Sequence, residues 1–158
     1  EELAGMLYEN SDEPYCEELA KAITNEIRRG NRIDTTTKLR NVIEKTLDFL
    51  PNNKEKKDII KKTCQRTFQA LRIDVNNEFE VLYEFMEKLP GALKPGGRVA
   101  ILTFHSGEDK LVKKALKAGY KEGIYSEYAR DVVRPSAQEC AQNGRARSTK
   151  MRWAVKAE

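Results

Sequence analysis

The chain has 158 residues, of which 39% are hydrophobic and 34% are charged, and 29 basic against 25 acidic residues give it a net charge of +4. This length suits one domain or two small ones. No apolar run approaches the ~20 residues that span a bilayer, and no N-terminal apolar segment resembles a secretion signal. We therefore predict a soluble, cytoplasmic protein with no membrane partner.

The charge is unevenly distributed along the chain. Residues 1–20 contain seven acidic residues and no lysine or arginine, so the rest of the chain carries 29 basic against 18 acidic residues. Such a chain can present its basic part to an anionic polymer. A set of ordinary solvated helix faces explains the same numbers, and on charge alone we favour that explanation.

The chain offers few ligands for a metal ion. Cys16, Cys64 and Cys140 are widely spaced, and His105 is the only histidine. Structural zinc sites need four closely spaced Cys or His ligands, and nothing here matches that spacing. The sequence therefore predicts reduced thiols and no metal site.

Two helices are predicted in the first third of the chain. The segment 11–14 (Ser-Asp-Glu-Pro) has the residues of a helix start, apolar residues then recur at spacings of four up to Ile27, and Gly30 ends the helix. A second helix begins after Thr35 and Thr36 and stops at Pro51. Neither is long enough to be stable alone, so the two must pack on each other or on a neighbour.

The strongest periodic pattern lies at residues 64–90. Apolar residues follow one another at steps of three and four, which predicts one continuous amphipathic helix. A second stripe beside it could line a cleft, although half-exposed boundary residues are the commoner explanation. That stripe consists of Gln69, Arg72, Asn76 and Tyr83.

The rest of the chain predicts a piece of an α/β fold. Residues 98–104 form a mainly apolar run after a Pro-Gly-Gly turn, typical of a strand buried on both faces of a parallel sheet. Helical spacing resumes at 108–117, residues 119–134 are irregular or weakly extended, and Pro135 and Ser136 open a short helix. Residues 150–156 alternate in polarity, which predicts a final strand whose wet face carries Lys150, Arg152 and Lys156.

A candidate site follows the strand at 98–104. Ligands bind at the carboxyl ends of strands in open α/β sheets, and His105 and Ser106 come directly after Phe104. The structural alternative makes Ser106 a helix cap, Glu108 a first-turn acid and His105 a hydrogen-bonded structural residue. We weigh the two about equally.

Three stretches together resemble the bacterial small-subunit ribosomal RNA methyltransferases of the RsmH/MraW type. They are Arg-Thr-Phe-Gln-Ala-Leu-Arg-Ile at 66–73, Phe-His-Ser at 104–106 with Glu108 and Asp109, and the closing segment 135–152 with its Arg-Ala-Arg-Ser at 145–148. The resemblance covers nearly the whole chain. Where the family has Leu, Arg and Pro, this chain has Gly107, Lys110 and Gly144, and Gly107 is expected to loosen its turn.

The resemblance implies an S-adenosylmethionine-dependent methyltransferase that acts on N4 of a cytidine in small-subunit ribosomal RNA. It implies an α/β chain with an inserted helical domain at 1–63 and the C-terminal part of a Rossmann-like methyltransferase sheet at 64–158. His105 and Ser106 would shape the catalytic pocket. Contact with RNA, or scaffolding of the site, would fall to a polar set comprising Arg66, Gln69, Arg72, Asn76, Arg145, Arg147 and Lys150.

The cofactor half of such an enzyme has no match in this sequence. The pair Gly96-Gly97 precedes a strand, whereas a donor-binding glycine loop follows one. The resemblance therefore implies a donor site that is mostly outside this chain, an isolated chain that is inactive, and a ribosomal RNA or ribosomal subunit partner. An open sheet edge also predicts that the isolated chain can form a homodimer.

Three alternatives remain at this point. Arg66 and Arg72 can pair with acids that brace two domains, and Arg145, Arg147 and Arg152 can be solvated charges around an edge strand. The chain as a whole can be a non-catalytic RNA- or ribosome-binding relative that has lost its donor site. A basic helical DNA-binding protein ranks last, because the helices meet through connections longer than those of a helix-turn-helix motif.

Overall fold

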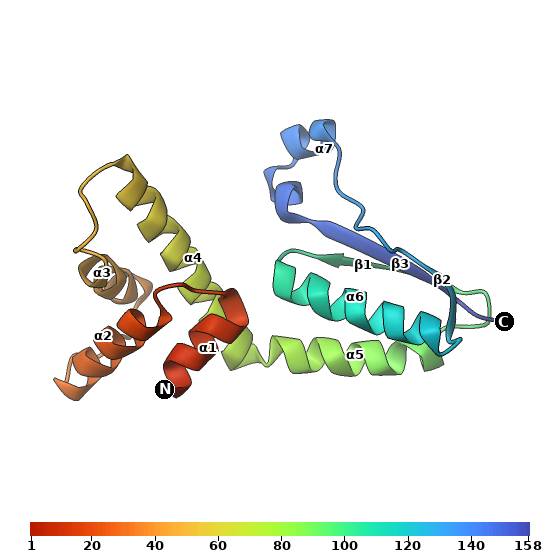
Figure 1. Cartoon of the computed structure of the whole chain (residues 1–158), viewed down its shortest axis with the longest axis horizontal. Helices are drawn as coiled ribbons and strands as arrows, with labels where there is room; N and C mark the ends of the chain where they lie inside the picture. Colours follow the sequence, from red (N-terminus) through yellow and green to blue (C-terminus); the bar gives the residue numbers. More distant parts are fainter. The chain divides into compact units, whose positions relative to one another are not determined.

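A computed structural model describes the whole chain, Glu1–Glu158. The chain divides into two compact units, Glu1–Asn77 and Glu78–Glu158, which we call the helical unit and the sheet unit (Figure 1). The sequence places a domain boundary at 63/64, whereas the compact units divide at 77/78. No helix in either unit is both long and apolar enough to cross a membrane.

The helical unit contains four helices, α1 (Glu2–Ser11), α2 (Cys16–Arg28), α3 (Thr36–Thr46) and α4 (Lys54–Asn76). Helix α1 packs along α4 and against α2, and α3 packs against both α2 and α4. The Nδ2 atom of Asn10 donates to the carbonyl oxygen of Ala70 at 3.1 Å, which ties α1 to α4. One core joins all four helices, with buried side chains Leu7, Leu19, Ile23, Leu39, Ile43, Leu47 and Ala70.

The helix ends test the local predictions. Thr35 caps α3, because its Oγ1 accepts from the amide of Lys38 at 3.2 Å, and Gly30 follows α2 with a φ of 83°, a left-handed conformation that glycine adopts without strain. The predicted helix start at Thr35 and Thr36 and the predicted end at Gly30 are confirmed, whereas α3 ends at Thr46, before the predicted stop at Pro51. The predicted helix start at Ser11 is wrong: Ser11 ends α1 and donates to the carbonyl oxygen of Leu7 at 2.9 Å.

The predicted single helix at 64–90 is two helices. Helix α4 ends at Asn76, Asn77 has a φ of 50°, and α5 (Glu78–Ala92) begins at the next residue. Asparagine is one of the few residues that adopt the left-handed conformation readily. The apolar spacing of three and four continues across Asn77, so the periodic pattern conceals the break. Val75, predicted on the buried stripe, is 77% exposed.

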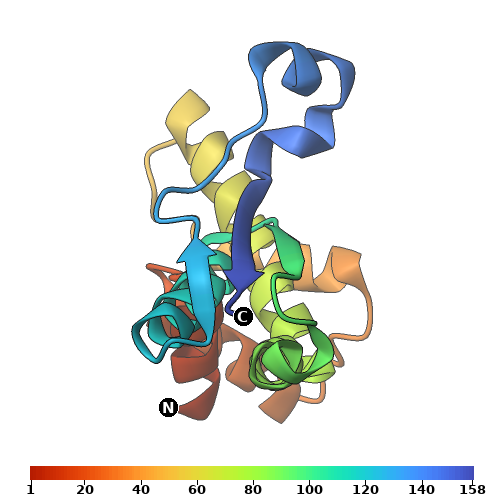
Figure 2. The ribbon, with the colours of Figure 1, turned by 90° about the vertical axis from the view of Figure 1, so that its right-hand side faces the viewer.

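The sheet unit contains α5, β1 (Arg98–Thr103), α6 (Ser106–Lys121), β2 (Tyr125–Tyr128), α7 (Ala137–Gln142), the 3-10 helix η1 (Gly144–Ser148) and β3 (Lys150–Lys156). The strand order is β1-β3-β2, and β3 runs antiparallel to both neighbours. Figure 2 shows the arrows of β2 and β3 pointing in opposite directions. Helix α6 packs against all three strands and α5 packs against α6. The core of this unit consists of Met86, Leu89, Val112, Leu116, Tyr125 and Ala154.

The sheet differs from the prediction in two ways. It is antiparallel, not parallel, because β3 returns between β1 and β2 instead of extending the row of strands. In addition, β1 is not buried on both faces: its burial alternates, with Val99, Ile101 and Thr103 toward the helices and Arg98, Ala100 and Leu102 exposed. The α/β class is confirmed, whereas the Rossmann-like and C-terminal assignments stay predictions.

The polarity of β3 is the reverse of the prediction. Arg152 is 5% exposed and Ala154 is fully buried, so the face expected to be wet is the one turned inward. The other face carries Met151, Trp153 and Val155, which pair with Leu102, Ala100 and Arg98 of β1. A shallow cavity of about 490 Å³ lies over this outer face. Arg152 is thus not a solvated charge on an edge strand, because β3 is the central strand.

Candidate functional site

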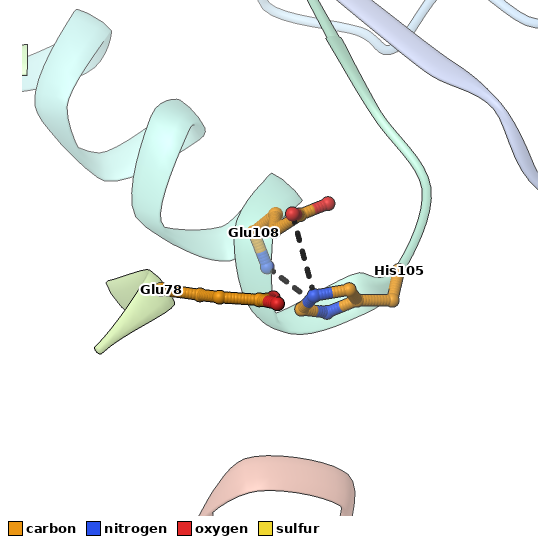
Figure 3. A group of neighbouring side chains, drawn as sticks. All are labelled: Glu78, His105 and Glu108. Carbon is orange, nitrogen blue, oxygen red and sulfur yellow. Dashed lines mark hydrogen bonds and ion pairs between the residues drawn. The ribbon is translucent and has the colours of Figure 1, made fainter. Parts of the chain in front are cut away.

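The candidate site lies where β1 passes into α6. His105 is the N-cap residue of α6: its φ is -139° and its Nδ1 accepts from the amide of Glu108 at 3.4 Å (Figure 3). In return, Oε2 of Glu108 accepts from the amide of Phe104 at 3.0 Å. This reciprocal pair resembles a capping box, with histidine at the capping position. The expected cap, Ser106, is instead the first residue of the helix and is exposed.

The cap fixes the tautomer of a neutral imidazole. Because Nδ1 accepts a hydrogen bond, a neutral ring carries its proton on Nε2. That nitrogen lies 3.5 Å from Oε1 of Glu108, and the two side chains are 11% and 24% exposed. Figure 3 shows the Glu78 side chain pointing toward the same imidazole from the start of α5. His105 is therefore held in one orientation, with Nε2–H directed at carboxylates.

An aromatic ring from a second helix packs against the histidine. Phe79 of α5 meets His105 edge to face, with ring centroids 5.8 Å apart and an interplanar angle of 66°. A Cβ atom at Gly107 would lie 2.7 Å from Cζ of Phe79 and 3.2 Å from Nδ1 of His105. The absent side chain at Gly107 therefore admits the Phe79 ring. Gly107 allows close packing here, and its expected loosening of the turn stays a prediction.

The same cluster has the residue types of a metal site. The ligand atoms of Glu78, His105 and Glu108 all lie within 4.8 Å of one another. A metal at Nε2 would have to displace the proton that the Nδ1 hydrogen bond places there, or break the helix cap. The hydrogen bond at Nδ1 therefore disfavours a cation at Nε2. The absence of a metal site stays a prediction, and this hydrogen bond supports it.

A buried ion pair underlies the candidate site. Nε and Nη2 of Arg152 donate to the two carboxylate oxygens of Asp109 at 2.7 and 3.1 Å. Nη1 of Arg152 donates to the carbonyl oxygens of Ala129 and Arg130. The hydrogen bonds from Arg152 hold the pKa of Asp109 below its usual value. This pair joins the first turn of α6 to β3, and so fixes the helix end that carries His105.

The closing segment reaches the same end of the sheet. Lys150 pairs with Thr103 across β3 and β1, so it lies beside the strand end that leads to His105. Arg145 and Arg147 are exposed on η1, five and three residues before Lys150 in the chain. The antiparallel return of β3 thus brings Lys150 and the strand end of His105 together. The sequence alone could not place them so, because it predicts a parallel sheet.

The other predicted contact residues belong to α4 of the helical unit. Nη1 of Arg66 lies 3.9 Å from Oε2 of the buried Glu13, so this arginine has a partner within its own unit. Gln69 is half-buried, while Arg72 and Asn76 are exposed and Nδ2 of Asn76 donates to the carbonyl oxygen of Arg72 at 2.9 Å. Their contact with a substrate stays a prediction.

Glu78 and Glu108 are the site residues that the sequence reasoning did not select. The sequence predicts Glu108 only as a first-turn acid, and Glu78 lies within the predicted helix at 64–90, between the apolar residues of its stripe. Glu108 belongs to a stretch that carries the family resemblance, which is the available signal for it. No spacing along the chain predicts that Glu78, in a different helix, shares the imidazole with Glu108.

The residues present do not fit a methyl-donor cofactor. In the pair Gly96-Gly97, the amide of Gly96 donates to the carbonyl oxygen of Lys156 at 3.0 Å and the carbonyl of Gly97 accepts from the amide of Lys156 at 2.8 Å. These backbone groups join β1 to β3 and leave no cradle for a ligand. In the segment after β1, the amides of Phe104 and Glu108 already donate to the side chains of Glu108 and His105. These residues therefore offer no contact to the donor.

The geometry defines an α/β unit whose strand end carries an oriented histidine between carboxylates, accompanied by a separate helical unit. A family model described as "MraW methylase family" matches residues 1–157. The chain belongs to this family.

Curated relatives agree over the whole chain. "Ribosomal RNA small subunit methyltransferase H 1" of Agathobacter rectalis is 89% identical over 158 residues, which are 100% of this chain and 45% of the relative. The protein of the same name from Lachnoclostridium phytofermentans is 72% identical over 99% of this chain and 42% of its own length. A methyltransferase H from Mesomycoplasma hyopneumoniae is 38% identical over 99% of this chain and 52% of its length. The chain thus spans about half the length of the relatives it matches.

Proposed function

We propose that this chain is part of an S-adenosylmethionine-dependent methyltransferase that modifies N4 of a cytidine in small-subunit ribosomal RNA. The observation that carries the proposal is the match of residues 1–157 to the methylase family, together with 89% identity to a relative named as a ribosomal RNA methyltransferase. The methyl group would come from S-adenosylmethionine, held by the part of the family's proteins that this chain does not match.

The chemistry sets what this chain has to provide. The lone pair of cytidine N4 is delocalised into the ring, so the amine must be aligned with the methyl group and must lose a proton as the bond forms. The target base must also leave its stack, while cations hold the RNA backbone. The sheet unit supplies an oriented imidazole, two carboxylates near it and Lys150 beside the strand end.

His105 is proposed as a positioning residue for this pocket. Its Nδ1 is occupied by the Glu108 amide and its Nε2 proton faces a carboxylate, so the neutral ring has no free lone pair for the amine proton. The carboxylates of Glu78 and Glu108 are the acceptors in this cluster. Lys150 and the exposed Arg145 and Arg147 would hold phosphates, because they are cations at or next to this end of the sheet.

The test uses the complete protein with purified small ribosomal subunits. We expect methyl transfer from labelled S-adenosylmethionine and an N4-methylcytidine product after nuclease digestion and mass spectrometry. His105→Ala should lower kcat by about a hundredfold, since misplacement of a reacting group by ~1 Å has this effect. Lys94→Ala, an exposed residue in the turn before β1, is the matched control and should leave kcat unchanged.

Two outcomes would overturn the proposal. A product methylated on another base, or on another atom of cytidine, would overturn the cytidine N4 assignment. Binding of small-subunit RNA without any methyl transfer by the complete protein would instead support the non-catalytic RNA-binding relative. The departures at Gly107, Lys110 and Gly144 are the features that favour that second function.

A further inference from the structure

The outer face of α6 carries five lysines with no acidic residue among them. The inner face of this helix buries Val112, Leu116 and Gly119 against the sheet. Five lysines occupy the opposite side at steps of three, one, three and four, which place them on one stripe of a helix. All five are exposed, and no acidic residue lies between the first and the last; they are Lys110, Lys113, Lys114, Lys117 and Lys121. We call this surface the α6 lysine face.

None of these lysines forms an ion pair within the chain. The ion pairs of the sheet unit include Lys88–Glu84 and Arg152–Asp109, and neither involves an α6 lysine. Lys113 contributes to the lowered pKa of Asp109, but Arg152 is the main cause and already holds both carboxylate oxygens. The charge of the face is therefore not neutralised by the protein itself.

This arrangement opposes the stability of the helix. Like charges three or four residues apart destabilise a helix, and the five lysines form several such pairs. A helix face that serves only solubility can intersperse acids with lysines, as α4 does with Glu55 and Asp58 among its lysines, and as α5 does with the Lys88–Glu84 pair. The α6 lysine face keeps a repulsion that a bound polyanion would relieve.

The face begins at the candidate site. Lys110 is two residues after Glu108, in the first turns of the helix that His105 caps. From Lys110 to Lys121 the stripe extends roughly 16 Å along the helix. A polyanion lying on it would reach the strand end where His105 and Lys150 lie. The neighbouring Arg145 and Arg147 would add cations at that end.

We propose that the α6 lysine face binds the phosphate backbone of the ribosomal RNA substrate and guides it to the end of β1. This inference rests on the proposed function, because the proposed function identifies the polyanion as ribosomal RNA. The contacts are to phosphates and carry no sequence preference. The face therefore raises affinity and fixes the direction of the RNA, while the choice of nucleotide belongs to other residues.

The test compares two triple variants of the complete protein that remove the same charge. One is Lys114→Gln, Lys117→Gln and Lys121→Gln on α6. The control is Lys54→Gln, Lys57→Gln and Lys61→Gln, three exposed lysines on one side of α4. The probe is a transcript of small-subunit ribosomal RNA without ribosomal proteins, and its dissociation constant is measured by filter binding from 50 to 300 mM KCl.

We expect the α6 variant to bind the transcript about tenfold more weakly at 100 mM salt, with a salt slope smaller by about two to three. The control should stay within about twofold. The midpoint of urea unfolding, followed by Trp153 fluorescence, should not fall for the α6 variant, because like-charge repulsion is removed. Equal losses in the two variants, or none in either, would overturn the proposal.

Two further measurements separate this inference from the proposed function and from another partner. Methyl transfer by the wild-type protein tests the function alone: if it is absent while the α6 variant still loses RNA affinity, the function fails and the RNA-binding face stands. If transfer is present and the α6 variant keeps the wild-type KM and salt slope, the face fails. Loss of binding to phosphatidylserine vesicles without loss of RNA binding would assign the face to a membrane and overturn it.

Discussion

The two units each bury a carboxylate near an arginine, and the two pairs differ in quality. In the sheet unit, Asp109 receives two hydrogen bonds from Arg152 at 2.7 and 3.1 Å, and both side chains are almost buried. In the helical unit, Glu13 is fully buried, but the nearest arginine nitrogen, on Arg66, is 3.9 Å away. The first pair is bidentate, whereas the second is only an ion pair at the limit of contact.

The pKa values of the two acids move in opposite directions as a result. The hydrogen bonds from Arg152 hold the pKa of Asp109 below its usual value. Burial raises the pKa of Glu13, and the amide of Tyr15, Arg66 and the hydroxyl of Thr63 oppose this only in part. Oε2 of Glu13 has no hydrogen bond. The geometry of the partner, and not its presence, therefore decides whether burial of a carboxylate is compensated.

Removing the good pair should have the largest effect. Arg152→Met leaves Asp109 without its two hydrogen bonds. It also removes the donor to the carbonyl oxygens of Ala129 and Arg130. We expect the free energy of unfolding to fall by about 3–5 kcal/mol, as for other buried pairs broken on one side. Urea unfolding followed by the fluorescence of Trp153, the only tryptophan and a residue of β3, measures it.

The matched control acts in the helical unit. Arg66→Met removes the distant partner of Glu13, and we expect a loss of at most about 1 kcal/mol, because the side chain of Arg66 is 39% exposed and its pairing is screened. An equal loss in the two variants would contradict the distinction between the pairs.

Glu13→Gln should change the pH dependence of the helical unit. Because the folded pKa of Glu13 is raised above its usual 4.5, the folded state binds the proton more tightly than the unfolded state. The protonated carboxyl of Glu13 therefore stabilises the folded state fully below pH 4.5, and this stabilisation is lost as pH rises through the folded-state pKa. Hydrogen exchange of buried amides in Glu1–Asn77 should show the advantage of the wild type over Glu13→Gln shrinking from pH 4 to 7.

Asp109 gives the opposite sign in the same titration. Its folded pKa lies below the usual 3.8, so its stabilisation is complete above that value and is lost only as pH falls through the folded value. Asp109→Asn should thus abolish an acid-induced loss that the wild type shows below pH 3.8. An advantage of wild type over Glu13→Gln that grows with pH would show that Glu13 is paired as Asp109 is.

The buried charges could not be predicted from sequence, and the helices largely could. Thr35 and Gly30 carry local signals for the ends of helices, and the structure follows them. The sequence does not predict the break at Asn77, because apolar spacing continues through it and one left-handed residue is enough to end a helix. The α/β class was predicted from the strand at 98–104, whereas strand direction depends on a return of the chain that no local pattern encodes.

The sequence predicts only part of the candidate site, because some of its residues meet through contacts between distant segments. His105 could be selected because it follows a strand, and the structure shows it capping α6 there. Its partner Glu78 comes from another helix, and the inward face of Arg152 depends on α6 covering that side of β3. Alternating polarity along a strand predicts two faces. It does not predict which face a helix covers when the partner of a buried arginine, here Asp109, lies on that helix.

The smallest effect concerns the hydroxyls around Glu13. Thr63 and Thr67 are both fully buried on α4; Oγ1 of Thr63 donates to Glu13 at 3.4 Å, whereas Oγ1 of Thr67 has no hydrogen bond. Valine has the shape of threonine without the hydroxyl. Thr67→Val should therefore stabilise the helical unit by about 1 kcal/mol, since it removes a buried polar atom without a partner.

Thr63→Val should be neutral or slightly destabilising, because a long hydrogen bond is lost and Glu13 keeps the amide of Tyr15 at 3.0 Å. Hydrogen exchange of the α4 amides at pH 6 compares the two substitutions at equal volume. If Thr67→Val destabilised the unit as much as Thr63→Val, the Thr67 hydroxyl would have a partner when folded. The carboxylate of Glu13 would then be the only polar group of this cluster whose burial is poorly compensated. The difference from Asp109 would rest on one distance, 3.9 Å to Arg66 against 2.7 Å to Arg152.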